Sequence, residues 1–74
     1  MSDVIIVKAA YDAEAGVWYV ESSDVHGLRL EGVTLEGLVE RLPGAIADLL
    51  EEEPFRDRPI EVIAHASTRL GLAA

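Results

Sequence analysis

Residues 34–53, TLEGLVERLPGAIADLLEEE, carry the clearest structural pattern of the chain. Apolar residues recur there at intervals of three and four, the spacing of an α-helix with one apolar side. Thr34 can cap this helix through its hydroxyl group. The spacing continues through Pro43, where the missing backbone N–H predicts a kink within one helix rather than two helices. The side expected to be buried against a sheet comprises Leu38, Leu42, Ile46 and Leu49.

Four segments outside the helix have the composition of β-strands. The first two are separated by the short turn DAEAG, which predicts a hairpin with Gly16 available for positive φ. Both faces of the first strand are largely apolar, so we expect it to be central or covered on both sides. The four predicted strands are residues 3–11 (DVIIVKAAY), 17–22 (VWYVES), 28–31 (LRLE) and 60–67 (IEVIAHAS).

The order strand, strand, strand, helix, strand predicts an α+β two-layer sandwich, in which an antiparallel three-strand meander is followed by the helix and a final strand. The 74 residues are expected to form one domain, residues 1–74. One helix covers one face of the sheet. The other face would expose Val4, Ile6 and either Trp18 or Tyr19, so we expect a homodimer or a higher oligomer.

The composition limits the classes of partner. Fourteen acidic residues against six basic ones give a net charge of -8, which disfavours nucleic acid and favours a basic protein partner. The chain has no cysteine, so neither a disulfide nor a thiolate metal site is expected. No apolar run is long enough to cross a bilayer, and no basic segment precedes the N-terminal apolar run. We therefore expect a soluble, cytoplasmic protein.

The candidate chemical groups are sparse. Glu21 and Asp24 are close in sequence and are the carboxylates that a metal-dependent nuclease would use, but a strand-end charge and a turn-forming Asp are the favoured explanation of them. His26 lies in a turn and His65 in the last strand, without the ligand spacing of a metal site. We expect no catalytic residue, no metal and no cofactor. Candidate partner-binding residues are Trp18, Tyr19, Glu21, Asp24 and His26.

The segments VKAAYDAEAGVWYVESSDVHGL (residues 7–28) and TLEGLVERLPGAIADLLEE (residues 34–52) together resemble the N-terminal domain of HicB-type antitoxins. They resemble even more closely the short bacterial proteins of unknown function grouped with those antitoxins. The matching features are the strand ending in Tyr11-Asp12, the acidic turn closing at Gly16, the aromatic second strand, the Ser-Asp-x-x-Gly-Leu turn and the Thr-Leu-Glu start of the helix.

This resemblance implies a fold similar to a truncated ribonuclease H core that lacks the catalytic acids. In the antitoxins this domain binds and occludes a small basic toxin that cleaves messenger RNA. Their further C-terminal DNA-binding domain has no counterpart before Ala74, so we do not expect autoregulation through DNA. The leading hypothesis is a non-catalytic, antitoxin-like interaction module with a HicA-type toxin as partner. The alternatives are a ribonuclease H-like nuclease using Glu21, Asp24 and a metal, and a small structural oligomer without a ligand.

Overall fold

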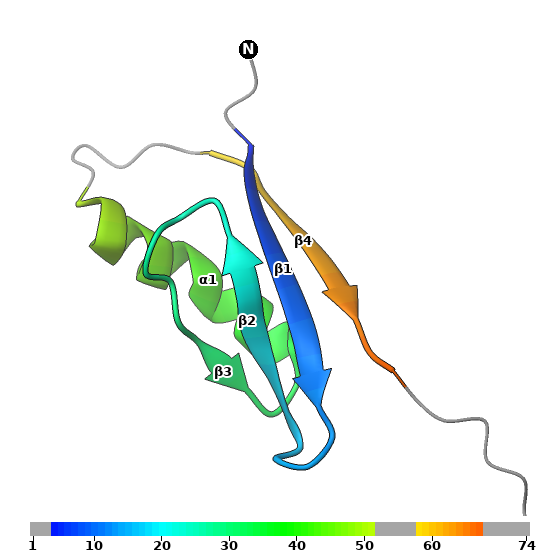
Figure 1. Ribbon diagram of the computed structural model, residues 1–74. Coiled ribbons are helices and arrows are strands. Elements are labelled where there is room, and N and C mark those ends of the chain that lie inside the picture. Colours follow the sequence, from blue (N-terminus) through cyan, green and yellow to red (C-terminus); the bar gives the residue numbers. More distant parts are fainter. Residues whose placement is uncertain (1–3, 52–57, 68–74) are drawn as a thin grey trace, which may run out of the picture.

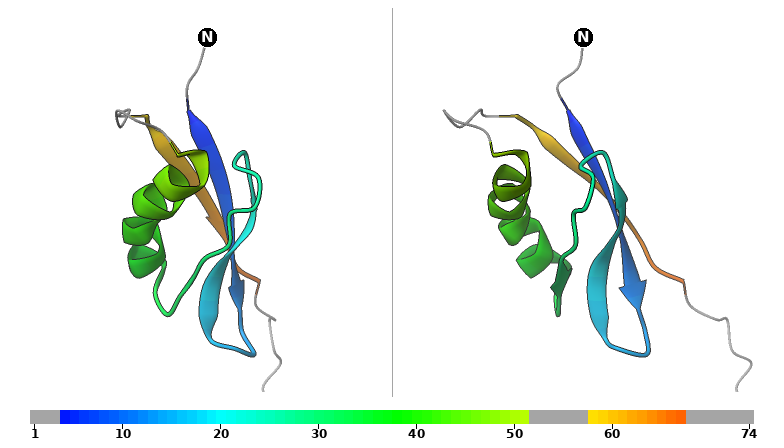
Figure 2. Two further views of the ribbon diagram at one scale, coloured as in Figure 1. Left: turned by 90° about the vertical axis from the view of Figure 1, so that its left-hand side faces the viewer. Right: turned by 60° about the vertical axis from the view of Figure 1, so that its left-hand side comes forward.

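The computed structural model describes residues 4–51 and 58–67, which form a four-stranded sheet with one helix against one face (Figures 1 and 2). The spatial order of the strands is β3-β2-β1-β4, so β1 is central, as predicted. β2 is antiparallel to both β1 and β3, whereas β4 is parallel to β1. The sheet is therefore mixed, and the α+β class is confirmed. The elements are β1 (Ile5–Asp12), β2 (Val17–Ser23), β3 (Glu31–Gly32), α1 (Leu35–Leu50) and β4 (Ile60–His65).

α1 begins where the sequence predicts. The Thr34 hydroxyl oxygen accepts a hydrogen bond from the Gly37 backbone N–H at 3.0 Å, which satisfies one of the free donors of the first turn. One helix runs through Pro43. It ends earlier than expected, because Glu51 adopts the left-handed conformation (φ 53°) and its N–H donates to the Ala47 carbonyl oxygen at 2.8 Å. Residues 52 and 53 lie outside the described part of the chain.

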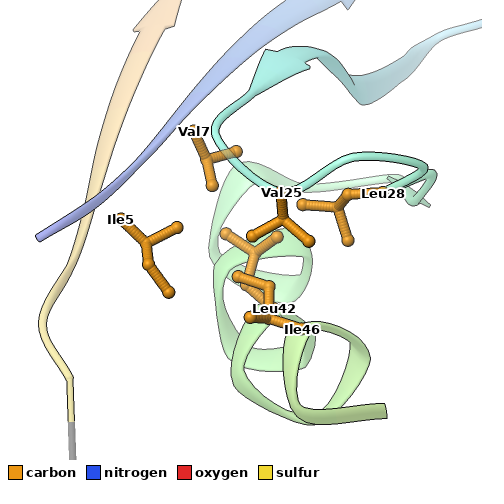
Figure 3. Close-up of a cluster of buried hydrophobic side chains, with 6 residues drawn as sticks. All are labelled: Ile5, Val7, Val25, Leu28, Leu42 and Ile46. Carbon is orange, nitrogen blue, oxygen red and sulfur yellow. The ribbon is translucent and has the colours of Figure 1, made fainter. Parts of the chain in front are cut away.

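Three of the four helix residues expected in the core are buried. Leu38, Leu42 and Ile46 are at most 3% exposed, but Leu49 is 44% exposed, so the prediction for Leu49 is wrong. The core cluster includes no helix residue after Ile46, but α1 continues for one further turn. Leu49 lies in that last turn, beyond the end of the core. Figure 3 shows the cluster, which consists of Ile5, Val7, Val25, Leu28, Leu42 and Ile46.

The third strand is shorter and later than predicted. Residues 28–31 were expected to form it, but β3 contains only Glu31 and Gly32. Leu28 does point into the core, and the Leu30 carbonyl oxygen accepts from the Val20 N–H at 3.1 Å, so this segment still runs beside β2. At Gly32 the backbone comes so close to α1 that a Cβ atom would lie 3.1 Å from the Leu38 nitrogen. Glycine therefore permits β3 to contact the start of the helix.

The other strand limits differ slightly from the prediction. β1 continues to Asp12, β2 continues to Ser23, and β4 ends at His65 instead of continuing to residue 67. The hairpin turn is held by Asp12, whose carboxylate accepts from the backbone N–H groups of Glu14 and Ala15. Gly16 has φ 72°, as its predicted role requires.

The turn after β2 is built differently from the expectation. The Asp24 side chain was expected to accept a hydrogen bond from the backbone N–H two residues further on. Ser23 makes this type of contact instead: its hydroxyl oxygen accepts a hydrogen bond from the Val25 N–H at 3.1 Å. Asp24 turns back to β1: its N–H donates to the Ile6 carbonyl oxygen, and its carboxylate accepts from the Ile6 N–H, both at 3.0 Å. Asp24 thus extends the pairing at the end of β1 where β2 has finished, while Gly27 (φ 85°) reverses the chain.

Candidate interaction surfaces

The pairing of β1 with β2 contains a β-bulge. Lys8 pairs with Ser22 and Ala9 pairs with Val20, so Glu21 lies opposite no residue of β1. Such an extra residue increases the local twist and redirects its own side chain. The Glu21 carboxylate reaches across β1 to β4, where it meets His65.

Glu21 and His65 form a side-chain bridge over the central strand. The Glu21 Oε1 and His65 Nε2 atoms are 3.0 Å apart, and the side chains are 46% and 55% exposed. Ala10 lies in β1 between the two neighbouring strands, pairs with His65 and Tyr19, and is only 4% exposed. The small side chain of Ala10 leaves room for the bridge. The pair carries opposite charges when the imidazole is protonated.

The five candidate partner-binding residues do not lie on one surface. Trp18 is on the helix side of β2, where its ring packs against Tyr11 with ring centroids 5.2 Å apart. Tyr19 and Glu21 lie on the outer face. The sequence left open whether Trp18 or Tyr19 would lie there, and in the structure it is Tyr19. Asp24 lies beside Ile6 near the start of β1, whereas Trp18 lies beside Tyr11 near its end. His26 is exposed in the turn that follows Asp24.

The outer face of the sheet is only moderately apolar. Ile6 is 36% exposed and Ile63 is 44% exposed, while Ala10 is only 4% exposed. Lys8 lies between Ile6 and Ala10 on this face and pairs with Ile63 of β4. The expected exposure of Ile6 is confirmed, but Val4 and Tyr19, which were expected to be exposed with it, are only partly exposed. No pattern in the sequence indicates that Glu21 and His65 meet above β1.

α1 carries a second surface, which combines apolar and acidic side chains. Val39 is 38% exposed and Leu50 is 37% exposed. A shallow hollow beside Val39 is lined by Leu35, Val39 and two carboxylates, those of Glu36 and Glu40. The only base within α1 is Arg41. We call Val39, Leu50 and the carboxylates Glu36, Glu40 and Glu51 the acidic helix surface.

The two carboxylates considered for metal chemistry have different partners. Glu21 contacts His65, and Asp24 accepts from the backbone of Ile6. Across residues 4–51 and 58–67 there is no group of three or more His, Asp or Glu side chains placed to hold a metal ion. The geometry that surrounds Glu21 and Asp24 is therefore that of two separate structural contacts.

These observations define a class: a small α+β domain with a mixed four-stranded sheet, one covering helix and acidic exposed surfaces. Residues 4–74 match the family described as "Domain of unknown function (DUF1902)", and the chain belongs to that family. It is also similar to the crystal structure of a hypothetical protein, TTHA1013, from the extremely thermophilic bacterium Thermus thermophilus. The two sequences are 38% identical, the match covers 93% of this chain and 99% of that one, and the TM-score is 0.65.

No curated protein matches the sequence. The one helix in the described ranges lacks the length and the apolar character that a bilayer-spanning segment needs.

Proposed function

We propose that this protein is a non-catalytic protein-interaction module, antitoxin-like in its mode of action, that binds a small basic protein. The observation that carries the proposal is the acidic helix surface. Exposed apolar side chains supply area that a partner can remove from water, and the surrounding carboxylates attract a partner of opposite charge. The net charge of -8 extends this attraction over a longer range.

The resemblance to HicB-type antitoxins gives the partner a chemical character. Those antitoxins occlude a small basic ribonuclease, and by analogy the partner here is a HicA-type toxin. The acidic helix surface supplies the electrostatic part of recognition. An exposed part of the sheet supplies further specific contacts, as Tyr19 and Glu21 on the outer face can do.

The test is to look for a small basic protein encoded beside this one and to titrate the purified protein with it, with binding measured by calorimetry. Glu40→Lys reverses a charge in the acidic helix surface, and Glu14→Lys makes the same change at an exposed position in the hairpin turn. We expect Glu40→Lys to weaken binding about tenfold or more, because a like charge is placed against a basic partner. Glu14→Lys should alter the affinity far less.

Equal losses from the two variants would show that only net charge matters and would remove the acidic helix surface from the proposal. Absence of a complex with the unmodified protein would contradict the interaction itself. Far-ultraviolet circular dichroism of each variant shows whether a loss of binding is a loss of folding.

A further inference from the structure

The two edges of the sheet are very different. β3 contains two residues, and a short edge strand offers little backbone for another chain to pair with. β4 contains six residues, IEVIAH, and pairs with β1 in an unbroken register from Ile60 to His65. It has neither the proline, the lysine nor the bulge by which edge strands usually avoid association. Within the described part of the chain, no strand lies on its other side.

The backbone direction in β4 follows from one hydrogen bond. The Ile5 N–H donates to the Pro59 carbonyl oxygen at 2.9 Å, so the carbonyl of Pro59 points towards β1. Backbone polar groups alternate in direction along a strand, and the N–H and C=O of one residue point to the same side. Glu61, Ile63 and His65 therefore direct theirs to β1. Ile60, Val62 and Ala64 direct theirs outwards, where an additional strand would accept and donate hydrogen bonds.

The side chains of β4 are complementary to a second copy of themselves in one register. Around a two-fold axis perpendicular to the sheet, each residue must face a residue of the same sheet face. Centring the pair on Ile63 places Glu61 opposite the second copy's His65, and does so twice by symmetry. Centring the pair on Val62 places Glu61 opposite the second copy's Ile63. Centring it on Ala64 places Ile63 opposite the second copy's His65. Neither register pairs opposite charges.

The register centred on Ile63 also agrees with the backbone. Val62 would face the second copy's Ala64, and both residues point their N–H and C=O groups outwards, so they can exchange two hydrogen bonds. Glu61, Ile63 and His65 would then occupy the non-hydrogen-bonded positions, where opposing Cα atoms are only about 4.5 Å apart and side chains are closest. Glu61 has no ion-pair partner in the described residues.

We propose that β4 pairs antiparallel with β4 of a second copy, centred on Ile63, to join the two four-stranded sheets into one. In the dimer, His65 lies between Glu21 of its own chain and Glu61 of the second copy. Its Nε2 atom already contacts Glu21, and Nδ1 remains for the second carboxylate, because a protonated imidazole donates from both nitrogens. The pairing does not use the acidic helix surface, the feature that carries the proposed function.

Cysteine substitution tests the register, since the natural sequence contains no cysteine. Ile63→Cys puts two thiols opposite each other at a non-hydrogen-bonded position, within reach of a disulfide. Val62→Cys and Ala64→Cys are the matched controls, because each would face a different residue. After mild oxidation, we expect a covalent dimer on a non-reducing gel from Ile63→Cys alone. A dimer from Val62→Cys or Ala64→Cys instead, or from none of the three, would overturn the proposal.

A proline substitution tests the edge itself. Ala64 is exposed and its N–H points away from β1, so Ala64→Pro removes an intermolecular donor from each copy without breaking the ladder to β1. We expect light scattering to give twice the 8.0 kDa chain mass for the parent and for the Ala64→Val control. Ala64→Pro should raise the dimer dissociation constant about tenfold or more. A monomeric parent at concentrations up to about 1 mM, or a folded Ala64→Pro dimer of unchanged affinity, would overturn the proposal.

Discussion

Leu42 is the side chain whose truncation most directly tests the packing of α1 on the sheet. It is 1% exposed and belongs to the core cluster, together with side chains from β1 and from the segment between β2 and β3. Leu42→Ala keeps the helix propensity favourable, so its effect comes from packing rather than from the backbone. Leu49→Ala is a matched control, because it makes the same substitution in the same helix at a side chain that is 44% exposed.

The expected loss can be estimated from the atoms removed. Leu42→Ala deletes three buried carbon atoms, each contributing about 0.8 kcal/mol to the free energy of unfolding. Any cavity that fails to collapse adds about 1 kcal/mol for each 40 Å³ that remains. The total is about 3 kcal/mol, against a whole-domain stability of about 4–11 kcal/mol for a chain of this length. Such a loss lowers the melting temperature by about 12–24 °C.

The assay is urea and thermal denaturation followed by circular dichroism, at one protein concentration so that association contributes equally to every sample. We expect Leu49→Ala to lose less than about 1 kcal/mol, because much of its side chain is already in water. The two variants should therefore differ by about 2 kcal/mol or more. Equal losses, or a Leu42→Ala protein that melts within a degree or two of the parent, would refute the register assigned to α1.

Three further predictions concern a cap, a turn and a class of ligand. Thr34→Ala should lower the free energy of unfolding by about 1 kcal/mol in urea denaturation, because the Gly37 N–H loses its acceptor, while Thr34→Ser should restore most of it. Asp24→Ala should cost about 1–2 kcal/mol in the same assay by leaving the Ile6 N–H without its side-chain acceptor, and Asp24→Asn, which keeps a side-chain oxygen, should cost less. The protein should show no sub-micromolar binding to DNA or RNA in gel-shift titrations at physiological salt, because its net charge is -8.

Much of the fold could be predicted from periodicity. The spacing of Leu38, Leu42 and Ile46 identified the helix and its buried side, and the hairpin followed from two apolar segments joined by an acidic turn. Leu49 has the same spacing and is nevertheless exposed, because periodicity shows which side of a helix is apolar and not how far the core extends beneath it. Val25 is buried although it lies in a turn, where the sequence has no repeating apolar spacing that would indicate burial.

The interaction surfaces were less accessible to sequence reasoning, because they depend on contacts between distant residues. Glu21 lies two residues after Tyr19 on the outer face of β2, and the parallel pairing of β4 with β1 places His65 on the same face, so the two side chains meet across β1. Asp24 has a position typical of a local turn, yet it accepts from Ile6, 18 residues earlier. Neither contact leaves a signal in a single sequence, since each joins residues without any fixed spacing.

The parallel pairing of β4 with β1 has a consequence for the order of folding. Ile5 meets Ile60, about 55 positions along the chain, whereas the hairpin joins Asp12 to Val17, so closing the longer loop costs about 2 kcal/mol more in chain entropy. The hairpin and α1 are therefore expected to associate before β4 arrives. Destabilising substitutions at Val62 of β4 should then act mainly by speeding unfolding, while those at Val20 of β2 should slow folding. The strand added last is thus the one whose contacts govern how long the native state persists.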